Sequence, residues 1–234
     1  MEQQEKDRFI AVIPARKGSK RLPGKNLKNL SGKPLILHTI KEAALCKSID
    51  NIYVLTDSPE IAEVATENGA EVPYLRSRKT SSDKASMLSV LLEFVDFFDN
   101  KERQFANVIL LQPTSPLRTA KQIDDACKLY ERSLADTLVS VMSFPKFCMD
   151  GKLMSVRAGY LVGKTALRMP TDQSETLVRN GPAILIEKFE RLRDEKTLYG
   201  AKTIPFLMDF KSSIDIDDGD DFWLAEAIFE KNKS

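Results

Sequence analysis

Two charged stretches far apart in the chain hold the residues whose types and spacing suit chemistry. The first, between residues 16 and 33, is a basic loop punctuated by glycine. Glycine lets backbone N–H groups approach an anion closely, and Arg and Lys supply charge, so this composition favours phosphate binding over a merely solvated loop. The stretch contains the seven cations Arg16, Lys17, Lys20, Arg21, Lys25, Lys28 and Lys33, interleaved with Gly18, Gly24 and Gly32.

This basic loop matches neither of two familiar phosphate-binding loops. A P-loop has four residues between its glycines and then Gly-Lys-Ser/Thr. Here five residues separate Gly18 from Gly24, and Asn26 follows Lys25. The Rossmann pattern Gly-x-Gly-x-x-Gly is also missing from the loop. The loop must therefore hold phosphate by another geometry.

An acidic run between residues 215 and 221 is the second distinctive stretch. If the chain is extended around Ile216, Asp215 and Asp217 point the same way, because strand side chains repeat every two residues. Two carboxylates on one face suit Mg2+, which takes one or two carboxylates together with phosphate oxygens and water. Helix capping accounts for the later acids but not for this pair. The run therefore predicts a magnesium site at Asp215 and Asp217, with Asp218, Asp220 and Asp221 serving the following helix.

Alternating strands and helices must position these two stretches. Apolar runs predict strands at 9–13, 51–56, 71–75, 108–111 and 137–142, and amphipathic patterns predict helices at 34–47, 59–68, 87–98 and 119–132, with a further helix after residue 221. This alternation predicts an α/β fold with a doubly wound, mostly parallel sheet. Because such sheets bind ligands at the carboxyl ends of their strands, we expect the basic loop and the acidic run to meet there.

Two further polar loops follow predicted strands. Residues 112–118 leave the strand at 108–111; their two prolines restrict the backbone, Gln112 offers an amide to a polar ligand edge, and Arg118 can reach a negative group. Residues 76–86 lead into the helix at 87–98, and Arg76 there suits either a ligand contact or a surface charge.

The stretch from 143 to 179 loses its periodicity. A long irregular segment in a compact domain is usually functional or mobile. Apolar residues stand there beside cations, which is typical of an interface, although the segment can also fold back over its own sheet. The apolar residues are Phe144, Phe147, Met149, Leu153, Met154, Tyr160, Leu161 and Val162, and the cations are Lys146, Lys152, Arg157, Lys164 and Arg168.

Composition narrows the possible functions. A chain of 234 residues with 42% hydrophobic residues can form one domain over 1–234, and a net charge of +1 gives no reason to expect nucleic acid or a membrane surface as a partner. No apolar run approaches the length of a membrane helix, and the polar start of the chain does not resemble a signal peptide. Three widely spaced cysteines and one histidine, His38, favour a cytoplasmic protein with structural thiols over a zinc site or a catalytic triad.

Several of these motifs resemble the CMP-sugar synthetases, the cytidylyltransferases that activate sialic acid and related nonulosonic acids. The resemblance rests on Ile13–Arg16, Gly18–Arg21, Lys25-Asn26, Ser31–Leu35 and the run 112–118. It implies a Rossmann-like nucleotidyltransferase fold, CTP and an acidic sugar as substrates, and Mg2+ held by the Asp-Ile-Asp motif. We expect Arg16, Ser19, Lys20 and Lys25 to bind the triphosphate, with Arg16 and Lys25 stabilising the transition state, and the resemblance assigns Asn26, Arg76, Ser86 and Gln112 to ribose and cytosine.

The resemblance also concerns the sugar and the assembly. It implies that 143–179 is an insertion that packs across a homodimer and brings basic residues to the sugar carboxylate. Gln112, Arg168 and Arg179 are the expected sugar-binding residues. The chain departs from the family pattern at Ser77, at Lys79-Thr80, at Pro182 and at Leu185, so the sugar pocket is its least matched part.

Two alternatives stay open from the sequence. The synthetase for 3-deoxy-manno-octulosonate shares the expected fold, but its family usually carries a Gly-Asp loop where this chain has Gln112–Pro116. A nucleotide-binding protein without turnover is the other alternative, and the intact basic loop and Asp pair argue against it.

Overall fold

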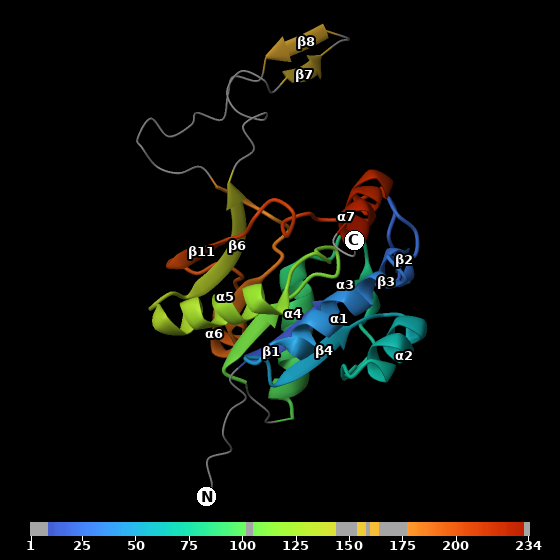
Figure 1. Ribbon diagram of the computed structural model, residues 1–234. Helices are drawn as coiled ribbons and strands as arrows, with labels where there is room; N and C mark the ends of the chain where they lie inside the picture. Colours follow the sequence, from blue (N-terminus) through green and yellow to red (C-terminus); the bar gives the residue numbers. More distant parts are fainter. Residues whose placement is uncertain (1–8, 102–104, 144–153, 158–159, 164–176, 232–234) are drawn as a thin grey trace, which may run out of the picture.

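The computed structural model describes residues 9–101, 105–143, 154–157, 160–163 and 177–231, and its centre is a seven-stranded sheet (Figure 1). The strands are β1 (Phe9–Pro14), β4 (Asn51–Leu55), β5 (Asn107–Leu110), β6 (Thr137–Ser143), β9 (Leu177–Arg179), β10 (Leu185–Lys188) and β11 (Thr203–Leu207). Their order is β11-β6-β10-β5-β1-β4, with β9 paired to β6 beside this path. Only β9 and β10 run antiparallel to their neighbours in this sheet, so the predicted mostly parallel α/β fold is confirmed.

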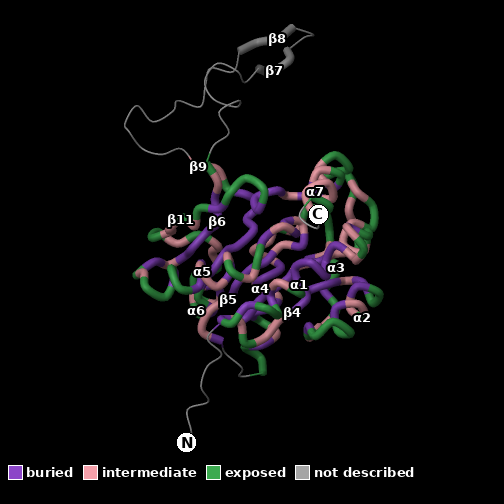
Figure 2. Tube along the Cα trace, viewed as in Figure 1, coloured by how far each residue is buried: buried purple, intermediate pink, exposed green. Residues whose placement is uncertain are grey.

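Helices cover both faces of the sheet. α1 (Leu35–Leu45), α2 (Pro59–Glu67) and α5 (Ala120–Arg132) pack on one face, and α4 (Met87–Asp99) and α6 (Phe189–Asp194) pack on the other. β1 supplies both cores: Phe9, Ala11 and Ile13 face the first layer, whereas Ile10 and Val12 face the second. Period-two alternation with apolar residues on both sides is what a central strand of a covered sheet requires, and Figure 2 shows buried segments running through the interior of the molecule.

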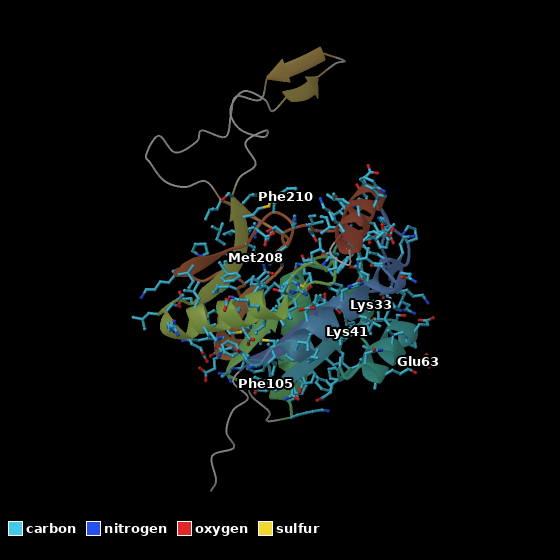
Figure 3. The ribbon with its side chains drawn as sticks, viewed as in Figure 1. Lys33, Lys41, Glu63, Phe105, Met208 and Phe210 are labelled. Carbon is cyan, nitrogen blue, oxygen red and sulfur yellow. The ribbon has the colours of Figure 1, made fainter. Side chains whose placement is uncertain are left out.

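An aromatic cluster consolidates the α4 layer far from the loops that carry charge. Phe105, labelled in Figure 3, lies with its ring centroid 5.1 Å from that of Phe98 and 5.8 Å from that of Tyr53. Phe94 and Phe189 complete the contacts around it. Edge-to-face and offset packing of this kind adds to the gain from burial.

One expected strand does not form. The sequence suggested a short strand over residues 71–75, but only isolated bridges from Glu71 to Tyr53 and from Leu75 to Thr56 are present. Pro73 lies between them and has no N–H to donate, so a continuous ladder cannot run through this segment.

A third apolar cluster joins segments that are far apart in sequence. Leu30 and Leu35 pack with Ile214, Ile216 and Phe222. This cluster seats α7 (Gly219–Lys231) beside the small sheet of β2 (Asn29–Leu30) and β3 (Lys33–Pro34), where Figure 1 shows the red and blue ends of the colour scale side by side. The acidic run is thereby held next to the basic loop.

Other expectations concern single residues and the insertion. His38 lies buried in α1 with its Nε2 2.9 Å from the Leu30 carbonyl oxygen, as a structural histidine would. Cys46 and Cys127 are free and buried, whereas Cys148 lies outside the described residues. Within the insertion, β7 (Met154–Arg157) pairs with β8 (Tyr160–Gly163) as a hairpin. Among the described residues, no helix combines the length and apolar character needed to span a bilayer.

Candidate active site

A cavity of about 210 Å³ opens at the carboxyl edge of β1 and β5. Its walls come from the basic loop, from the segment between 76 and 90, and from the loop that follows β5. A second hollow adjoins it and is lined by the cations Arg16, Lys20, Arg21 and Lys25 together with Ser19, Asp83 and Asp217. The structure thus brings the charged residues of both ends of the chain to one edge of the sheet, as the parallel topology predicts.

Lys25 is held at the junction of the two charged stretches. Gly24 adopts a left-handed conformation, with φ of 66°, and begins the short 3-10 helix η1 (Lys25–Leu27). Lys25 Nζ donates to the carbonyl oxygen of Ile216 over 2.6 Å. Burial lowers the pKa of Lys25, and the nearby Asp217 and Asp215 carboxylates oppose that shift. A partly desolvated cation between these acids is well placed to attract phosphate.

The three other cations that line the second hollow are paired with acids. Arg16 Nη1 lies 2.7 Å from Asp83 Oδ1, and Lys20 Nζ lies 2.8 Å from Asp83 Oδ2. Arg21 Nη2 lies 2.9 Å from Asp217 Oδ1. All of these side chains retain solvent exposure, so the pairs are of the weak, exchangeable kind.

Asp215 and Asp217 both belong to this edge, although their segment is not a named strand. Asp215 is largely buried, burial raises the pKa of its carboxyl, and its Oδ1 has no hydrogen-bond partner among the described residues. Gly181 approaches so closely that a Cβ built there would stand 3.4 Å from Asp215 Oδ2. An orphaned carboxylate oxygen beside a second carboxylate fits a hard cation, so the residues present suit Mg2+.

The remaining acids of the run serve α7, as predicted. Asp218 Oδ1 accepts from the backbone N–H groups of Asp220 and Asp221. Asp221 Oδ2 in turn accepts from the N–H groups of Asp217 and Asp218 at 2.9 and 3.2 Å. These bonds satisfy the start of the helix and fix the backbone that carries Asp217.

Arg118 does not have the role that its position suggested. We expected it to reach a negative ligand group, but its side chain is 1% exposed and donates to the protein itself. Nη1 binds the carbonyl oxygens of Gln112 and Ala183 at 3.3 and 2.8 Å, and Nη2 binds the Thr39 hydroxyl at 2.9 Å. Burial lowers the pKa of Arg118 to about 9. The guanidinium therefore clamps the loop after β5 to the start of β10 and to α1.

A buried polar network holds the backbone of the acidic run in place. Asn180 accepts from the Ser140 hydroxyl at 2.6 Å and donates to the Ser213 hydroxyl at 2.9 Å, and its amide also lies 3.4 Å from the sulfur of Met208, which Figure 3 labels. The Ile216 N–H donates to the Thr114 carbonyl oxygen over 2.7 Å. These bonds link β6, the approach to β10 and the loop after β5 to the segment of Asp215.

Three of the four residues assigned to ribose and cytosine line the cavity at the carboxyl edge of β1 and β5. Asn26 donates to the carbonyl oxygen of Arg16 at 2.9 Å, Gln112 donates to that of Gly181 at 3.5 Å, and Arg76 donates to that of Thr80. The fourth, Ser86, is not among the lining residues. Its hydroxyl caps α4 by accepting from the Ser89 N–H at 3.1 Å.

The expected sugar-binding residues lie apart. Gln112 lines the cavity. Arg179, on β9, directs its guanidinium to Tyr199, with Nη1 2.5 Å from the phenol oxygen, and it does not line either hollow of the site. Arg168 lies outside the described residues, so its assignment stays a prediction.

The sequence gives two residues of the site no individual role. Arg21 was one of several cations in the loop, and only the structure pairs it with Asp217. Asp83 lies in the polar segment 76–86, and the structure places it against Arg16 and Lys20. Asp83 is an isolated acid in an otherwise polar and basic segment, which is the only sign in the sequence that it pairs with a cation. Nothing in that segment indicates that its partner lies more than sixty residues away.

Comparison with known proteins identifies the relatives of this arrangement. A family model described as cytidylyltransferase matches residues 10–160. The chain is 36% identical over 232 residues to the CMP-N,N'-diacetyllegionaminic acid synthase of Legionella pneumophila, covering 97% of this chain and 98% of that protein. It is also 36% identical over 219 residues to an N-acylneuraminate cytidylyltransferase of Streptococcus agalactiae, of whose length it spans about half, 51%.

Solved structures agree on the fold. A CMP:2-keto-3-deoxy-manno-octonic acid synthetase complexed with CTP superposes with a TM-score of 0.71 at 17% identity, covering 96% of this chain and 99% of that one. A 4-diphosphocytidyl-2C-methyl-D-erythritol synthase gives 0.70 at 10% identity, again over 96% and 99%. Identities this low show only that the nucleotidyltransferase fold is shared, whereas the relatives at 36% identity also show the family. The chain belongs to the cytidylyltransferase family, among the CMP-nonulosonic acid synthetases.

Proposed function

We propose that this protein transfers CMP from CTP to the anomeric hydroxyl of a sialic-acid-like nonulosonic acid, with Mg2+ as the cofactor and pyrophosphate as the second product. The observation that carries the proposal is the meeting of the basic loop with the acidic run, where Lys25 binds the Ile216 carbonyl and Arg21 pairs with Asp217. Nucleotidyl transfer needs both parts, because cations must balance the phosphates while carboxylates hold the metal.

The cavity at the carboxyl edge of β1 and β5 suits the nucleoside, and the adjoining hollow suits the triphosphate. Asn26, Arg76 and Gln112 offer donors and acceptors around the first space, as a ribose and a pyrimidine edge require. Arg16, Ser19, Lys20 and Lys25 border the second. The boundary between the two spaces is where the α-phosphate of CTP would lie, and Arg16, Ser19 and Lys25 border both.

The reaction is an in-line displacement at that phosphate. The sugar hydroxyl oxygen forms a bond to the α-phosphorus, the bond from this phosphorus to the bridging oxygen of pyrophosphate breaks, and the hydroxyl proton passes to solvent water. Negative charge grows on the phosphate oxygens, and Arg16 and Lys25 are positioned to balance it. Asp215 and Asp217 would hold Mg2+, which supplies charge neutralisation at the phosphates when bound.

The sugar class follows from the relatives and from the cavity. The named relatives act on diacetyllegionaminic acid and on N-acylneuraminate, both acidic nonulosonic sugars. Gln112 is the cavity residue we assign to the sugar, and Arg168 and Arg179 stay candidates for its carboxylate. Because the reaction consumes CTP, a cytosolic nucleotide, we place it in the cytoplasm.

A substrate panel tests this function. CTP and Mg2+ would be combined with sialic, legionaminic and pseudaminic acids and with 3-deoxy-manno-octulosonate, and release of pyrophosphate would be measured. We expect release with at least one nonulosonic acid and none when ATP replaces CTP. Release with the octulosonate alone, or tight CTP binding without release for any sugar, would support one of the two alternative functions instead.

A further inference from the structure

The Asp83 carboxylate is fully engaged by cations of the triphosphate site. One oxygen lies 2.7 Å from Arg16 Nη1 and the other lies 2.8 Å from Lys20 Nζ. The hydrogen bonds from Lys20 and Arg16 lower the pKa of Asp83, so it is an anion throughout the neutral range. A carboxylate that binds two cations in this way makes the same contacts as two oxygens of a phosphate group.

Asp83 is carried by a short loop with anchored ends. The loop leaves α3 (Arg78–Ser81) and reaches α4 at its cap, Ser86. On the α3 side, the Ser77 N–H donates to Glu93 of α4 at 3.0 Å. Asp83 itself has a side chain that is 43% exposed and that receives no hydrogen bond from its own loop among those described. It can therefore leave Arg16 and Lys20 without unfolding either helix.

The position of Asp83 makes it a competitor for phosphate. It borders both the cavity at the carboxyl edge of β1 and β5 and the adjoining hollow, and the other acid in that hollow is Asp217. Asp217 has a proposed task in the reaction, because it would bind Mg2+. Asp83 has none, yet it occupies two of the four cations that line the hollow.

We propose that Asp83 is an internal counter-ion that phosphate displaces, and that it sets how tightly the site retains pyrophosphate. The inference rests on the proposed function, because it takes the hollow to be the triphosphate site. CTP exchanges its own phosphate oxygens for the carboxylate on Arg16 and Lys20. After CMP transfer, the carboxylate competes for the same two cations and promotes release of pyrophosphate.

Binding of pyrophosphate without Mg2+ gives a direct test that needs no turnover. Calorimetry would compare the intact protein with Asp83→Asn, which keeps the side-chain shape and removes the charge. Loss of two exposed ion pairs should tighten pyrophosphate binding by about three- to tenfold. The gain should shrink as salt rises, because screening weakens the competing pairs. Asp83→Glu should bind like the intact protein.

Glu60→Gln provides a matched control. Glu60 pairs with Lys17 of the same loop at 3.0 Å, but Lys17 lines neither hollow, so this variant should change pyrophosphate affinity by less than about twofold. Equal tightening in both variants would mean that only net charge matters and would overturn the proposal. Weaker binding by Asp83→Asn would overturn it as well, since Asp83 would then assist the ligand.

The outcomes also distinguish a failure of the counter-ion role from a failure of the proposed function. If the intact protein binds pyrophosphate and Asp83→Asn binds no more tightly, the counter-ion role fails while the triphosphate site stands. If neither protein binds pyrophosphate or CTP, with or without Mg2+, the proposed function itself fails. In steady-state assays with CTP, Asp83→Asn should lower the inhibition constant of pyrophosphate by a factor similar to the gain in binding.

Discussion

Single residues in this site owe their properties to partners far along the chain. Burial against loops that precede it by many residues raises the pKa of Asp215. Burial also lowers the pKa of Lys25, whose Nζ contacts the later residue Ile216. Their charges are then close enough to influence each other, as each carboxylate of the Asp pair favours the charged lysine. Local sequence indicates the residue types, and the fold determines the electrostatics.

The Asp pair leads to a first prediction at this scale. Asp215→Asn and Asp217→Asn should each lower the rate of pyrophosphate release by about a hundredfold or more, because an amide is a poorer ligand for Mg2+ than a carboxylate. The loss should be greatest at limiting Mg2+. Initial rates over a Mg2+ titration would measure it.

Asp218→Asn is the matched control for this experiment. It removes the same charge from the same segment, and asparagine still caps a helix, so activity should stay close to that of the intact protein. Thermal unfolding would confirm that all three variants fold. Near-normal activity of both Asp215→Asn and Asp217→Asn at limiting Mg2+ would rule out their metal role.

At the scale of elements, the loop after β5 depends on a residue that looks like a ligand contact in the sequence. Removing the Arg118 guanidinium takes a donor at 2.8 Å from the buried carbonyl oxygen of Ala183 and one of three donors from that of Gln112, so Arg118→Lys should destabilise the protein by about 2–4 kcal/mol. CTP should bind more weakly, since Gln112 loses its support. Urea unfolding and CTP titration would measure the two effects.

Arg132→Lys is the comparison for this variant, since Arg132 is exposed in the last turn of α5. It should alter neither stability nor CTP binding appreciably. Unchanged stability of Arg118→Lys would show that the lysine reaches the same carbonyls and that the guanidinium is dispensable.

β10 carries a buried acid in the middle of the sheet. Glu187 accepts from the Thr137 hydroxyl at 2.6 Å and from Arg191 Nη1 at 2.9 Å, and burial raises its pKa to about 7 despite these donors. A folded pKa above the unfolded value means that the folded state keeps a proton that the unfolded state loses. The contribution of Glu187 to stability is therefore full below the unfolded pKa of about 4.5 and falls as pH rises to about 7.

This sign gives a prediction for Glu187→Gln. Between pH 5 and pH 8, the free energy of unfolding of the intact protein should fall relative to that of the variant, by up to about 3 kcal/mol. Urea unfolding of both proteins at the two pH values would measure the difference. Glu195→Gln removes the exposed partner of the same Arg191 and serves as the control, so its free energy of unfolding should fall with pH as that of the intact protein does. If the free energy of unfolding of Glu187→Gln falls with pH in parallel with that of the intact protein, the prediction is contradicted.

Arg118 and Glu187 show which parts of the molecule the sequence could predict. β1, β4, β5 and α5 have strong local patterns, and their bounds agree with expectation to within about one residue at most ends. β10 has no such pattern, because a charged Glu187 interrupts it and its stability comes from β5 and β6. Likewise, the cavity residues follow from motif and topology, whereas the burial of Arg118 depends on carbonyl groups that no side-chain pattern reveals.

At the scale of the whole molecule, the insertion leaves the sheet beside an exposed apolar surface. Leu207 and Phe210 are 56% and 57% exposed, and with Met142 and Met208 they border a hollow at the end of β6. Figure 3 labels Met208 and Phe210. An apolar patch next to the point where residues 144–153 begin adds to the sequence argument for a homodimer through 143–179.

Mixing two inactive variants tests that assembly. One carries Asp217→Asn and the other carries Arg157→Ala or Lys164→Ala, cations of the insertion expected to serve the neighbouring sugar site. Hybrid dimers would hold one complete site, so part of the activity should return after subunits exchange. A monomer in sedimentation at working concentration, or no recovery after confirmed exchange, would contradict shared sites and favour a segment folded over its own sheet.

The bond from Lys25 to the Ile216 carbonyl joins residues 191 positions apart, and this separation has a consequence for biosynthesis. The basic loop leaves the ribosome well before the Asp pair, because it precedes the pair in the chain. A nascent chain can pair β1 with β4 and β5 long before residues 214–217 appear, since domains acquire structure in the order of synthesis. Until then its cations have neither the Asp pair nor α7 beside them, so a chain interrupted before Asp215 would keep the phosphate-attracting loop but lack the two carboxylates that we propose for Mg2+.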